Sequence, residues 1–370
     1  MWLASLRLQD WRNYAEANIS LHPGVNFFSG GNGQGKTNLL EAVDTLSVGK
    51  PFRTARDAEV IRFGADCAVL SGLIHGEGRD TRIDISFPSA GKKRVLVDRA
   101  ASTAAALAGK LPCVLFCPED LNLIQSGPAI RRKLMNATLC QLRPRYAAEL
   151  AVYSRLIEQK TAILKKAKER PDLLELLPEY NERIAVTGAE LIRFRAAFVR
   201  LLFRYAPPLH AEISGGEELS GVYKTVSTVE NPFSETGELA DALRAHLASH
   251  REAELASASC LSGPHRDDIC ISIDGREART YASQGQCRTA AIALKLACRT
   301  LMENEKCGTP ILLLDDILSE LDAKRQDYVL NRIDRGQIFI TGCETDAAER
   351  LRAGRIFTIK SGKITDTRDF

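Results

Sequence analysis

The feature that most constrains the fold of this chain is a glycine-rich octapeptide, GGNGQGKT, at residues 30–37. It satisfies the pattern G-x-x-x-x-G-K-[ST] without a mismatch, and it stands between an apolar run, GVNFFSG, and a helix-forming run, KTNLLEAVDTLSVG. Glycines allow backbone N–H groups to curve around phosphates, and the start of the following helix adds partial positive charge. The alternative, a chance glycine-rich turn, does not require a strand before it and a helix after it. The context therefore predicts a phosphate-binding P-loop.

The side chains of this segment suit a nucleoside triphosphate with Mg²⁺. Lys36 is expected to reach the β- and γ-phosphates, and the Thr37 hydroxyl is expected to ligate Mg²⁺. The predicted nucleotide contacts in the loop and the first turn of the helix are Gly30, Gly31, Asn32, Gly33, Gln34, Gly35, Lys36, Thr37 and Asn38.

A second motif, ILLLDD at residues 311–316, places two carboxylates at the end of an apolar strand. The carboxyl ends of buried parallel strands are where α/β sheets bind ligands. We expect Asp315 to hold Mg²⁺ through water, and Asp316 to orient or deprotonate the attacking water. Many core strands end in Asp, so this motif is informative only together with the P-loop. The two motifs combined predict a site that binds ATP with Mg²⁺ and hydrolyses it.

The pattern along the chain predicts an α/β body interrupted by a helical insertion. Strand patterns and one helix precede residue 119, and alternating strands and helices resume after residue 261. Between them the chain is rich in Leu, Ala, Arg, Lys and Glu at helical spacing, with two helices long enough for an antiparallel pair, and the prolines of APPLH are expected to close this region. We therefore expect an ATPase head from residues 1–118 and 262–370, and a mainly helical arm domain at residues 119–261.

The insertion carries most of the excess positive charge. Residues 128–206 hold 16 Lys and Arg against 8 Asp and Glu, whereas the net charge of the whole chain is only +3. A basic helical segment on a mildly acidic body suits a polyanionic partner such as DNA, although a solvated helical surface would have the same composition. The candidate DNA contacts are Arg131, Arg132, Lys133, Lys165 and Lys166.

The composition gives no sign of export or of membrane insertion. No stretch has the ~20 apolar residues that a membrane helix needs, and the N-terminal run MWLASLRLQDWRNY is charged where a secretory signal is apolar. The ten cysteines include no C-x-x-C pair, so a disulfide framework is not expected. The expected location is the cytoplasm.

Two short segments distinguish between families of P-loop proteins. SELD, at residues 319–322, resembles the D-loop of ABC-class ATPases, which complete each nucleotide site with a second subunit. SQGQ, at residues 283–286, opens a helix, like the segment that these enzymes present to the γ-phosphate on the other subunit. Ser283 is able both to cap the helix and to donate to phosphate, and Gly285 lets the backbone approach closely.

The order of P-loop, long insertion, SQGQ turn, Asp-Asp strand and D-loop resembles the ABC-type ATPases of the SMC class. More narrowly, LQDWRNY, PEDLNLI, GPHRDD, SQGQCR and LLLDDILSELD are similar to segments of the RecF family of bacterial recombination mediators, and they cover nearly the whole chain in the expected order. The resemblance implies that Asp315 is the Walker B acid and that Asp316 is its catalytic neighbour. It also implies that Lys36 and Ser283 take part in catalysis.

The same resemblance implies an ATP-dependent homodimer with ATP and Mg²⁺ as cofactors. The signature segment that acts across the dimer would consist of Ser283, Gly285 and Gln286, and Arg12 would be a further nucleotide contact. Cys287 departs from the family pattern, in which Gln is more frequent. No histidine follows the strand QIFIT, where Thr341 is either a substitute for a switch residue or a plain strand end. We expect GPHRDD to be structural, because one histidine beside an arginine makes a poor metal site.

The function implied by the resemblance is ATP-gated DNA binding in recombinational repair and replication restart. ATP would join two copies on duplex DNA or on a single-strand–duplex junction, and slow, DNA-stimulated hydrolysis would release them. RecR and RecO would be partners in loading RecA. Two alternatives stay open: a nucleotide-binding subunit of an ABC transporter, and a nucleotide-switched DNA clamp with vestigial hydrolysis. The basic insertion and the absence of LSGGQ count against the transporter.

Overall fold

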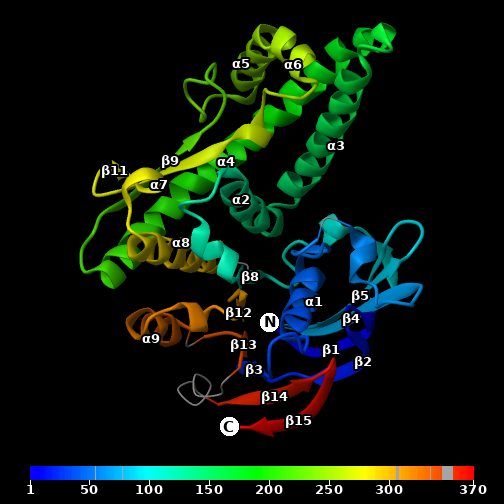
Figure 1. Ribbon diagram of the computed structural model, residues 1–370, viewed down its shortest axis with the longest axis vertical. Coiled ribbons are helices and arrows are strands. Elements are labelled where there is room, and N and C mark those ends of the chain that lie inside the picture. The colour runs from blue at the N-terminus through cyan, green and yellow to red at the C-terminus, as the bar shows by residue number, and fades with distance from the viewer. Residues whose placement is uncertain (55, 77, 306–307, 334, 344–352) are drawn as a thin grey trace. The chain divides into compact units, whose positions relative to one another are not determined.

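A computed structural model describes residues 1–370 apart from 55, 77, 306–307, 334 and 344–352 (Figure 1). It is an α/β unit that carries the P-loop sequence and is interrupted by a mainly helical insertion, as predicted. The described residues form two compact units, Met1–Asn122 with Ala291–Phe370, and Leu123–Ala290. The first unit resumes at Ala291, whereas the sequence pattern has the head resume at residue 262. The difference arises because residues 268–277 pair with a strand of the second unit, so the SQGQ segment lies in that unit.

The first unit carries the P-loop on a six-stranded sheet with the order β15-β14-β3-β13-β12-β8, parallel except for β15. The runs GVNFFSG, ILLLD and QIFIT form its three central strands, and their nearly continuous burial is typical of a covered parallel sheet. The six strands are β3 (Val25–Ser29), β8 (Cys113–Phe116), β12 (Ile311–Asp315), β13 (Ile338–Gly342), β14 (Gly354–Lys360) and β15 (Lys363–Asp369).

A second sheet of the first unit is antiparallel and has the order β2-β1-β4-β5-β6-β7. One hydrophobic core joins this sheet, the parallel sheet and α1 (Lys36–Val48), the helix that follows the P-loop. The buried Gln337 amide ties the two sheets together through hydrogen bonds of 2.8 Å to both backbone groups of Leu3. The strands are β1 (Trp2–Trp11), β2 (Tyr14–Ser20), β4 (Cys67–His75), β5 (Asp80–Pro88), β6 (Arg94–Val97) and β7 (Ala100–Ser102). This unit also contains α9 (Ala323–Arg332) and, from Ala291 on, the rest of α8 (Gln284–Asn304).

The second unit is built on the predicted antiparallel pair of long helices, α3 (Pro144–Lys166) and α4 (Leu177–Ser214). Leu164 at the end of α3 packs with Leu177 at the start of α4, and Arg145 near the start of α3 lies 2.8 Å from Glu190 further along α4. The other elements are α2 (Pro128–Leu142), α5 (Thr236–Ser249), α6 (Arg251–Ser257), α7 (Ala278–Tyr281), the start of α8 (Gln284–Asn304), and the strands β9 (Leu219–Lys224), β10 (Asp268–Ile273) and β11 (Arg276–Glu277).

The C-terminal end of α4 differs from the prediction. APPLH predicts a helix end, but α4 continues through both prolines to Ser214, so that prediction is wrong. A proline lacks an N–H donor and crowds the preceding turn. The burial of Ala206, His210 and Ile213 against the rest of the unit outweighs this local preference. The helix ends at Gly215, whose left-handed φ of 91° is typical of a helix C-cap.

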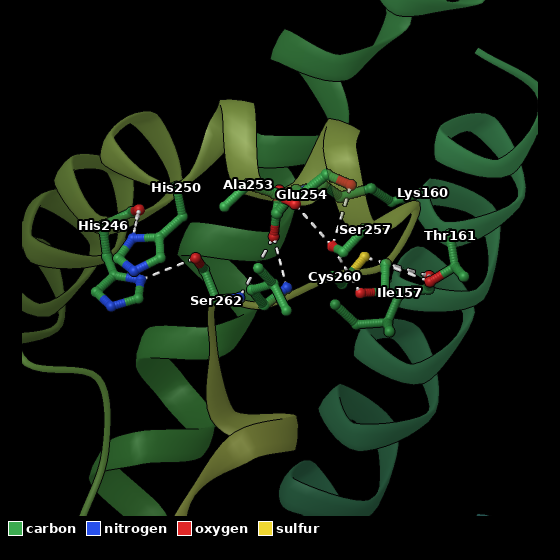
Figure 2. A network of polar contacts seen from close by, with 12 residues as sticks. Ile157, Lys160, Thr161, His246, His250, Ala253, Glu254, Ser257, Cys260 and Ser262 are labelled. Carbon is green, nitrogen blue, oxygen red and sulfur yellow. Dashed lines mark hydrogen bonds and ion pairs between the residues drawn. The ribbon is translucent and has the colours of Figure 1, made fainter. Parts of the chain in front are cut away.

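A buried polar network fixes α6 and the segment after it to α3 (Figure 2). The ammonium of Lys160 lies 2.6 Å from Oε2 of Glu254, and both side chains are almost fully buried. Oε1 of Glu254 accepts from the backbone N–H groups of Leu261 at 2.8 Å and Ser262 at 3.3 Å, and the Ser262 hydroxyl contacts His246. Removing either charge would leave the other buried without its counter-ion. Lys160 is therefore a core residue, although it contributes to the basic composition of the insertion.

Two further observations concern the cysteines and the apolarity of the helices. The nine cysteines within the described residues are free, and Cys307 lies outside them. In the same part of the chain, no helix combines the length and the apolarity needed to cross a membrane.

Gly72 of β4 provides a test of the core beneath α1. A Cβ at this position would lie 2.7 Å from Cδ1 of Leu46 and 3.0 Å from Cδ1 of Leu3, both of which are buried. We expect Gly72→Ala to lower the free energy of unfolding by about 1–3 kcal/mol, because the core is overpacked. Gly237→Ala, which meets open space, is the matched control and should change it by less than about 0.5 kcal/mol. Calorimetric unfolding measures both, and equal values would show that Leu46 moves aside at no cost.

Candidate functional site

The P-loop connects β3 to α1, and glycines allow its curvature. Gly33 and Gly35 have φ angles of 76° and 115°, a region that favours glycine. A Cβ on Gly35 would also lie 2.6 Å from Nδ2 of Asn13 and 3.0 Å from the hydroxyl of Tyr14. The predicted strand, turn and helix are all present, and the loop is free to curve its backbone N–H groups around a phosphate.

Lys36 is the first residue of α1, and its buried side chain folds back into the curve of the loop. Its ammonium donates to the backbone oxygen of Gly30 at 2.5 Å and to that of Gly31 at 3.0 Å. Asn32 lies in the same loop, where its Oδ1 accepts from the Cys343 thiol at 3.4 Å. The ammonium of Lys36 is therefore held at the loop, where a P-loop lysine meets the terminal phosphates.

Two hairpin turns brace the P-loop from outside. Between β14 and β15, Ser361 N–H donates to Oε1 of Gln34 at 2.7 Å, and Gly362 N–H donates to the Gln34 backbone oxygen at 3.0 Å. Between β1 and β2, Asn13 Nδ2 donates to the same backbone oxygen at 2.9 Å, and Asn38 Nδ2 donates to Oδ1 of Asn13 at 2.8 Å. Gln34 and Asn38 thus use side-chain hydrogen bonds within the protein, and their contact with a nucleotide stays a prediction.

Thr37 and Asp315 meet although they are far apart in the sequence. The Thr37 hydroxyl donates to Oδ1 of Asp315 at 2.9 Å, and the Thr341 hydroxyl of the neighbouring strand β13 donates to the same oxygen at 2.9 Å. Burial raises the pKa of Asp315 above its ordinary value, while the two hydroxyl donors lower it. A hydroxyl and a carboxylate are hard oxygen donors of the kind that Mg²⁺ prefers, so this pair fits the predicted metal.

Asp316 has an unusual backbone conformation directly after β12. Its φ of 50° lies in the left-handed region, which is often strained at functional sites. Its N–H donates to the hydroxyl of Thr341 at 2.8 Å, and its carboxylate accepts from the Ser319 hydroxyl at 3.2 Å. Thr341 thus contacts both acidic residues, a role that the sequence analysis missed. A hydroxyl at the end of the strand next to β12 is the signal that could have located it.

Arg12 is engaged inside the first unit. Its guanidinium forms a bidentate pair with the fully buried carboxylate of Glu41 at 2.8 and 2.9 Å, and Nη1 donates to the Glu59 backbone oxygen at 2.8 Å. This pair fixes the turn between β1 and β2 to α1, so Arg12 has a structural role. Its predicted nucleotide contact stays a prediction. Arg53, which the sequence analysis did not single out, donates to Oδ1 of Asn38 at 2.9 Å.

The signature segment in the second unit forms a reciprocal helix cap at the start of α8. The Ser283 hydroxyl accepts from Gln286 N–H at 3.2 Å, and Ser283 N–H donates to Oε1 of Gln286 at 2.9 Å. This arrangement is a capping box, which satisfies two N–H groups at the helix start. Ser283 is exposed and its own hydroxyl hydrogen is not used in the cap, so it is able to donate to a phosphate.

Cys287 points into the protein rather than toward solvent. Its thiol is buried, lies 3.9 Å from the backbone oxygen of Ala282, and has a pKa raised by burial. The departure from the family pattern at this position is therefore a packing difference. The exposed part of the signature segment retains Ser283 and its neighbour Gln284.

The five candidate DNA contacts differ in their exposure to solvent. Arg131 is buried, forms a bidentate pair with Asp268 at 2.6 and 2.8 Å, and donates to three backbone oxygens, so its prediction as a DNA contact is corrected to a structural role. Arg132 is half-buried and donates to the Asp267 backbone oxygen at 2.7 Å. The three exposed candidates are Lys133, Lys165 and Lys166.

The GPHRDD segment is part of the core of the second unit. Asp267 binds the buried guanidinium of Arg195 at 3.0 Å and accepts from the Tyr223 hydroxyl, while His265 contacts the Tyr153 hydroxyl at 2.8 Å. Within the described residues, no group of three or more His, Cys, Asp or Glu side chains is arranged to hold a metal ion. The segment's polar side chains are used for packing, which fits the structural role predicted for it.

Comparisons with known proteins agree over nearly the whole chain. A family model described as RecF/RecN/SMC N terminal domain matches residues 2–364. The DNA replication and repair protein RecF of Agathobacter rectalis is 35% identical over 367 residues, which cover 98% of this chain and 99% of that protein. The protein of the same name from Bacillus subtilis strain 168 is 35% identical over 369 residues, which cover 98% of this chain and 100% of that one.

Solved structures give the same result. The recombination mediator protein RecF with ATPrS has a TM-score of 0.90 and 31% identity, covering 99% of this chain and 98% of that one. RecF with ATP has a TM-score of 0.88 and 31% identity, covering 100% and 97%. An Smc head domain from Pyrococcus furiosus, with 14% identity and a TM-score of 0.55, shares the fold alone.

The buried carboxylate of Asp315 should reduce stability. We expect Asp315→Asn to raise the free energy of unfolding at pH 7 by about 1 kcal/mol, because the amide oxygen still accepts both hydroxyl hydrogen bonds and the buried charge is removed. The gain should disappear as the pH falls through the raised pKa of Asp315, because the wild-type carboxyl then becomes neutral as well. Denaturant titrations at several pH values measure this, with Asp316→Asn as control. A loss of stability at pH 7 would contradict the prediction.

Proposed function

The chain belongs to the RecF family within the RecF/RecN/SMC group, and from this membership we propose that it is an ATP-dependent DNA-binding protein of recombinational repair and replication restart. The observation that carries the proposal is the 2.9 Å hydrogen bond between Thr37 and Asp315 beside the curve of the P-loop. This bond brings the P-loop and the strand that ends at Asp315 together, and a magnesium-dependent P-loop ATPase needs both motifs at one site. The RecF structures with ATP and ATPrS support ATP as the nucleotide.

In the proposed site each residue has a separate task. The loop's backbone N–H groups and Lys36 would bind the phosphates, and the Thr37 hydroxyl and Asp315 would hold Mg²⁺. Bound Mg²⁺ supplies positive charge that neutralises the phosphates. Asp316 orients the attacking water and accepts its proton. Hydrolysis is proposed to be slow.

The site is proposed to be completed by a second copy of the chain. Ser283 is exposed, opens a helix, and has a hydroxyl hydrogen available beyond the capping box. We infer that it donates to the γ-phosphate bound by the partner, where Gly285 allows close approach of the backbone. ATP would then act as the bridge that joins two heads.

The exposed lysines of α2 and α3 are proposed to bind the DNA backbone. Lys133, Lys165 and Lys166 are exposed, whereas Arg131 and Lys160 are buried and paired with carboxylates. Duplex DNA or a single-strand–duplex junction is the proposed ligand, with RecR and RecO as partners and loading of RecA as the outcome, in the cytoplasm. The full-length relatives are DNA replication and repair proteins, which favours this function over a transporter subunit. Multiple-turnover phosphate release, measured with and without DNA, separates a working ATPase from a clamp with vestigial hydrolysis.

ATP should drive dimerisation. We expect the wild type to shift from monomer to dimer on addition of ATP and Mg²⁺ in analytical ultracentrifugation. Lys36→Ala should stay monomeric because ATP affinity falls tenfold or more, by loss of about 1.5–3 kcal/mol of charged hydrogen bonding. Ser283→Arg should bind ATP normally but stay monomeric. Ser227→Arg, at an exposed serine of the same unit, is the control. A wild type that stays monomeric at every ATP concentration would contradict the dimer.

DNA binding should depend on the exposed lysines of α3. We expect the double variant Lys165→Glu with Lys166→Glu to bind duplex DNA more weakly. The plot of log affinity against log salt should also become less steep, with the magnitude of its slope reduced by about 2, as expected for the loss of two phosphate contacts. Fluorescence anisotropy over a range of salt concentrations measures this in the presence of ATP. Lys92→Glu, at an exposed lysine of the first unit, is the control. An unchanged slope would remove both lysines from the DNA surface.

A further inference from the structure

Glu217 links the end of α4 to the signature segment. Its Oε1 accepts from Nε2 of Gln286 at 2.8 Å, and its Oε2 lies 3.3 Å from Nε2 of His210. All the residues concerned belong to the second unit. We call His210, Glu217, Gln286 and Ser283 the Glu217 clasp.

The position of Glu217 is set by the way α4 ends. Gly215 and Gly216 have left-handed φ angles of 91° and 118°, and both of their N–H groups donate to the Ala211 backbone oxygen at 2.9 Å. Glu217 N–H then donates to the Ser214 hydroxyl at 3.1 Å. The turn leaves little freedom in the backbone, so the carboxylate of Glu217 is presented by the helix end itself.

Gln286 is held at both ends of its side-chain amide. The amide oxygen accepts from Ser283 N–H in the capping box, and the amide nitrogen donates to Glu217. A flip of this amide would bring two oxygens together at Glu217 and two N–H donors together at Ser283. Glu217 therefore determines the orientation of Gln286, and Gln286 in turn holds the backbone of Ser283.

His210 completes the connection to the long helix. It is fully buried on the part of α4 that follows the two prolines. Burial lowers the pKa of His210, and Nε2 of the ring lies 3.3 Å from Oε2 of Glu217. The carboxylate thus has one partner on α4 and one at the start of α8.

We propose that Glu217 is a positioning residue for the signature segment, and that it couples the position of α4 to the presentation of Ser283. This inference rests on the proposed ATP-dependent dimer, in which Ser283 meets the nucleotide of the partner. Because α3 and α4 are packed as a pair, a change in the position of α3 on binding DNA would be transmitted through α4 and Glu217 to the signature segment. The clasp would make DNA binding and dimer formation depend on each other.

The first test compares Glu217→Ala with Glu217→Gln. Glutamine keeps an acceptor oxygen for Gln286, whereas alanine does not. In Glu217→Ala we expect the backbone amide exchange rate over residues 283–286 and the dissociation constant of the ATP-bound dimer each to rise about tenfold. This is the effect of losing one charge-assisted hydrogen bond. Glu217→Gln should stay within about threefold of the wild type. Affinity for a fluorescent ATP analogue should be unchanged in both, because the P-loop is untouched.

A second pair of variants distinguishes loss of the contact between Glu217 and Gln286 from misfolding. Gln286→Glu keeps an acceptor for the capping box but opposes Glu217 with a like charge, so it should weaken the dimer as Glu217→Ala does. Combining it with Glu217→Gln restores the hydrogen bond with donor and acceptor exchanged, and should return backbone amide exchange over residues 283–286 to the wild-type level. Glu218→Ala, at the exposed neighbouring residue, is the matched control.

The outcomes separate the two proposals. A wild type that dimerises with ATP, together with a Glu217→Ala variant that dimerises and exchanges equally well, would overturn the role of Glu217 and leave the proposed function intact. Failure of the double exchange to restore slow amide exchange over residues 283–286 would also overturn it. If the wild type does not dimerise, the proposed function fails and the coupling fails with it. The exchange measurement on the monomer then decides whether Glu217 still orders the signature segment.

Discussion

The hydrogen bond between Thr37 and Asp315 is the interaction on which the ATPase head depends. The two residues lie 278 positions apart, and they meet because β3 and β12 each pair with β13. The second unit begins shortly after β8 and ends before β12, and these two strands pair side by side. An insertion whose two ends lie on neighbouring strands does not disturb the pairing of the sheet. The head is therefore able to carry a large arm while its two nucleotide motifs stay together.

The same interaction explains why the head needs a second hydroxyl beside Asp315. A carboxylate buried in a sheet is destabilising unless donors surround it. Thr37 and Thr341 both donate to Asp315, and Thr341 also accepts from the N–H group of Asp316. One threonine on β13 thus holds both acidic residues in position, including the left-handed backbone of the second. The site combines a cost in stability with a geometry suited to a metal ion.

In the second unit, part of the positive charge is used for folding. Arg131, Lys160 and Arg195 are buried and paired with Asp268, Glu254 and Asp267. The net charge of the insertion therefore overstates the surface that DNA could meet, since a sequence count does not separate paired core cations from exposed ones. The long helix α4 follows the same pattern: its local signal for an end at two prolines is overridden by the packing of residues beyond them.

The sequence by itself determined the P-loop, the central strands and the antiparallel helix pair, because each depends on short-range spacing of glycines or apolar residues. It also identified Ser283 as a helix cap. Only the tertiary structure decided which side chains meet. Thr341 beside the two acidic residues, Glu217 at Gln286, and the counter-ion of Arg131 all join positions distant in the chain. Such pairs depend on how strands and helices pack, and one sequence carries no local signal for a partner that only folding brings within 3 Å.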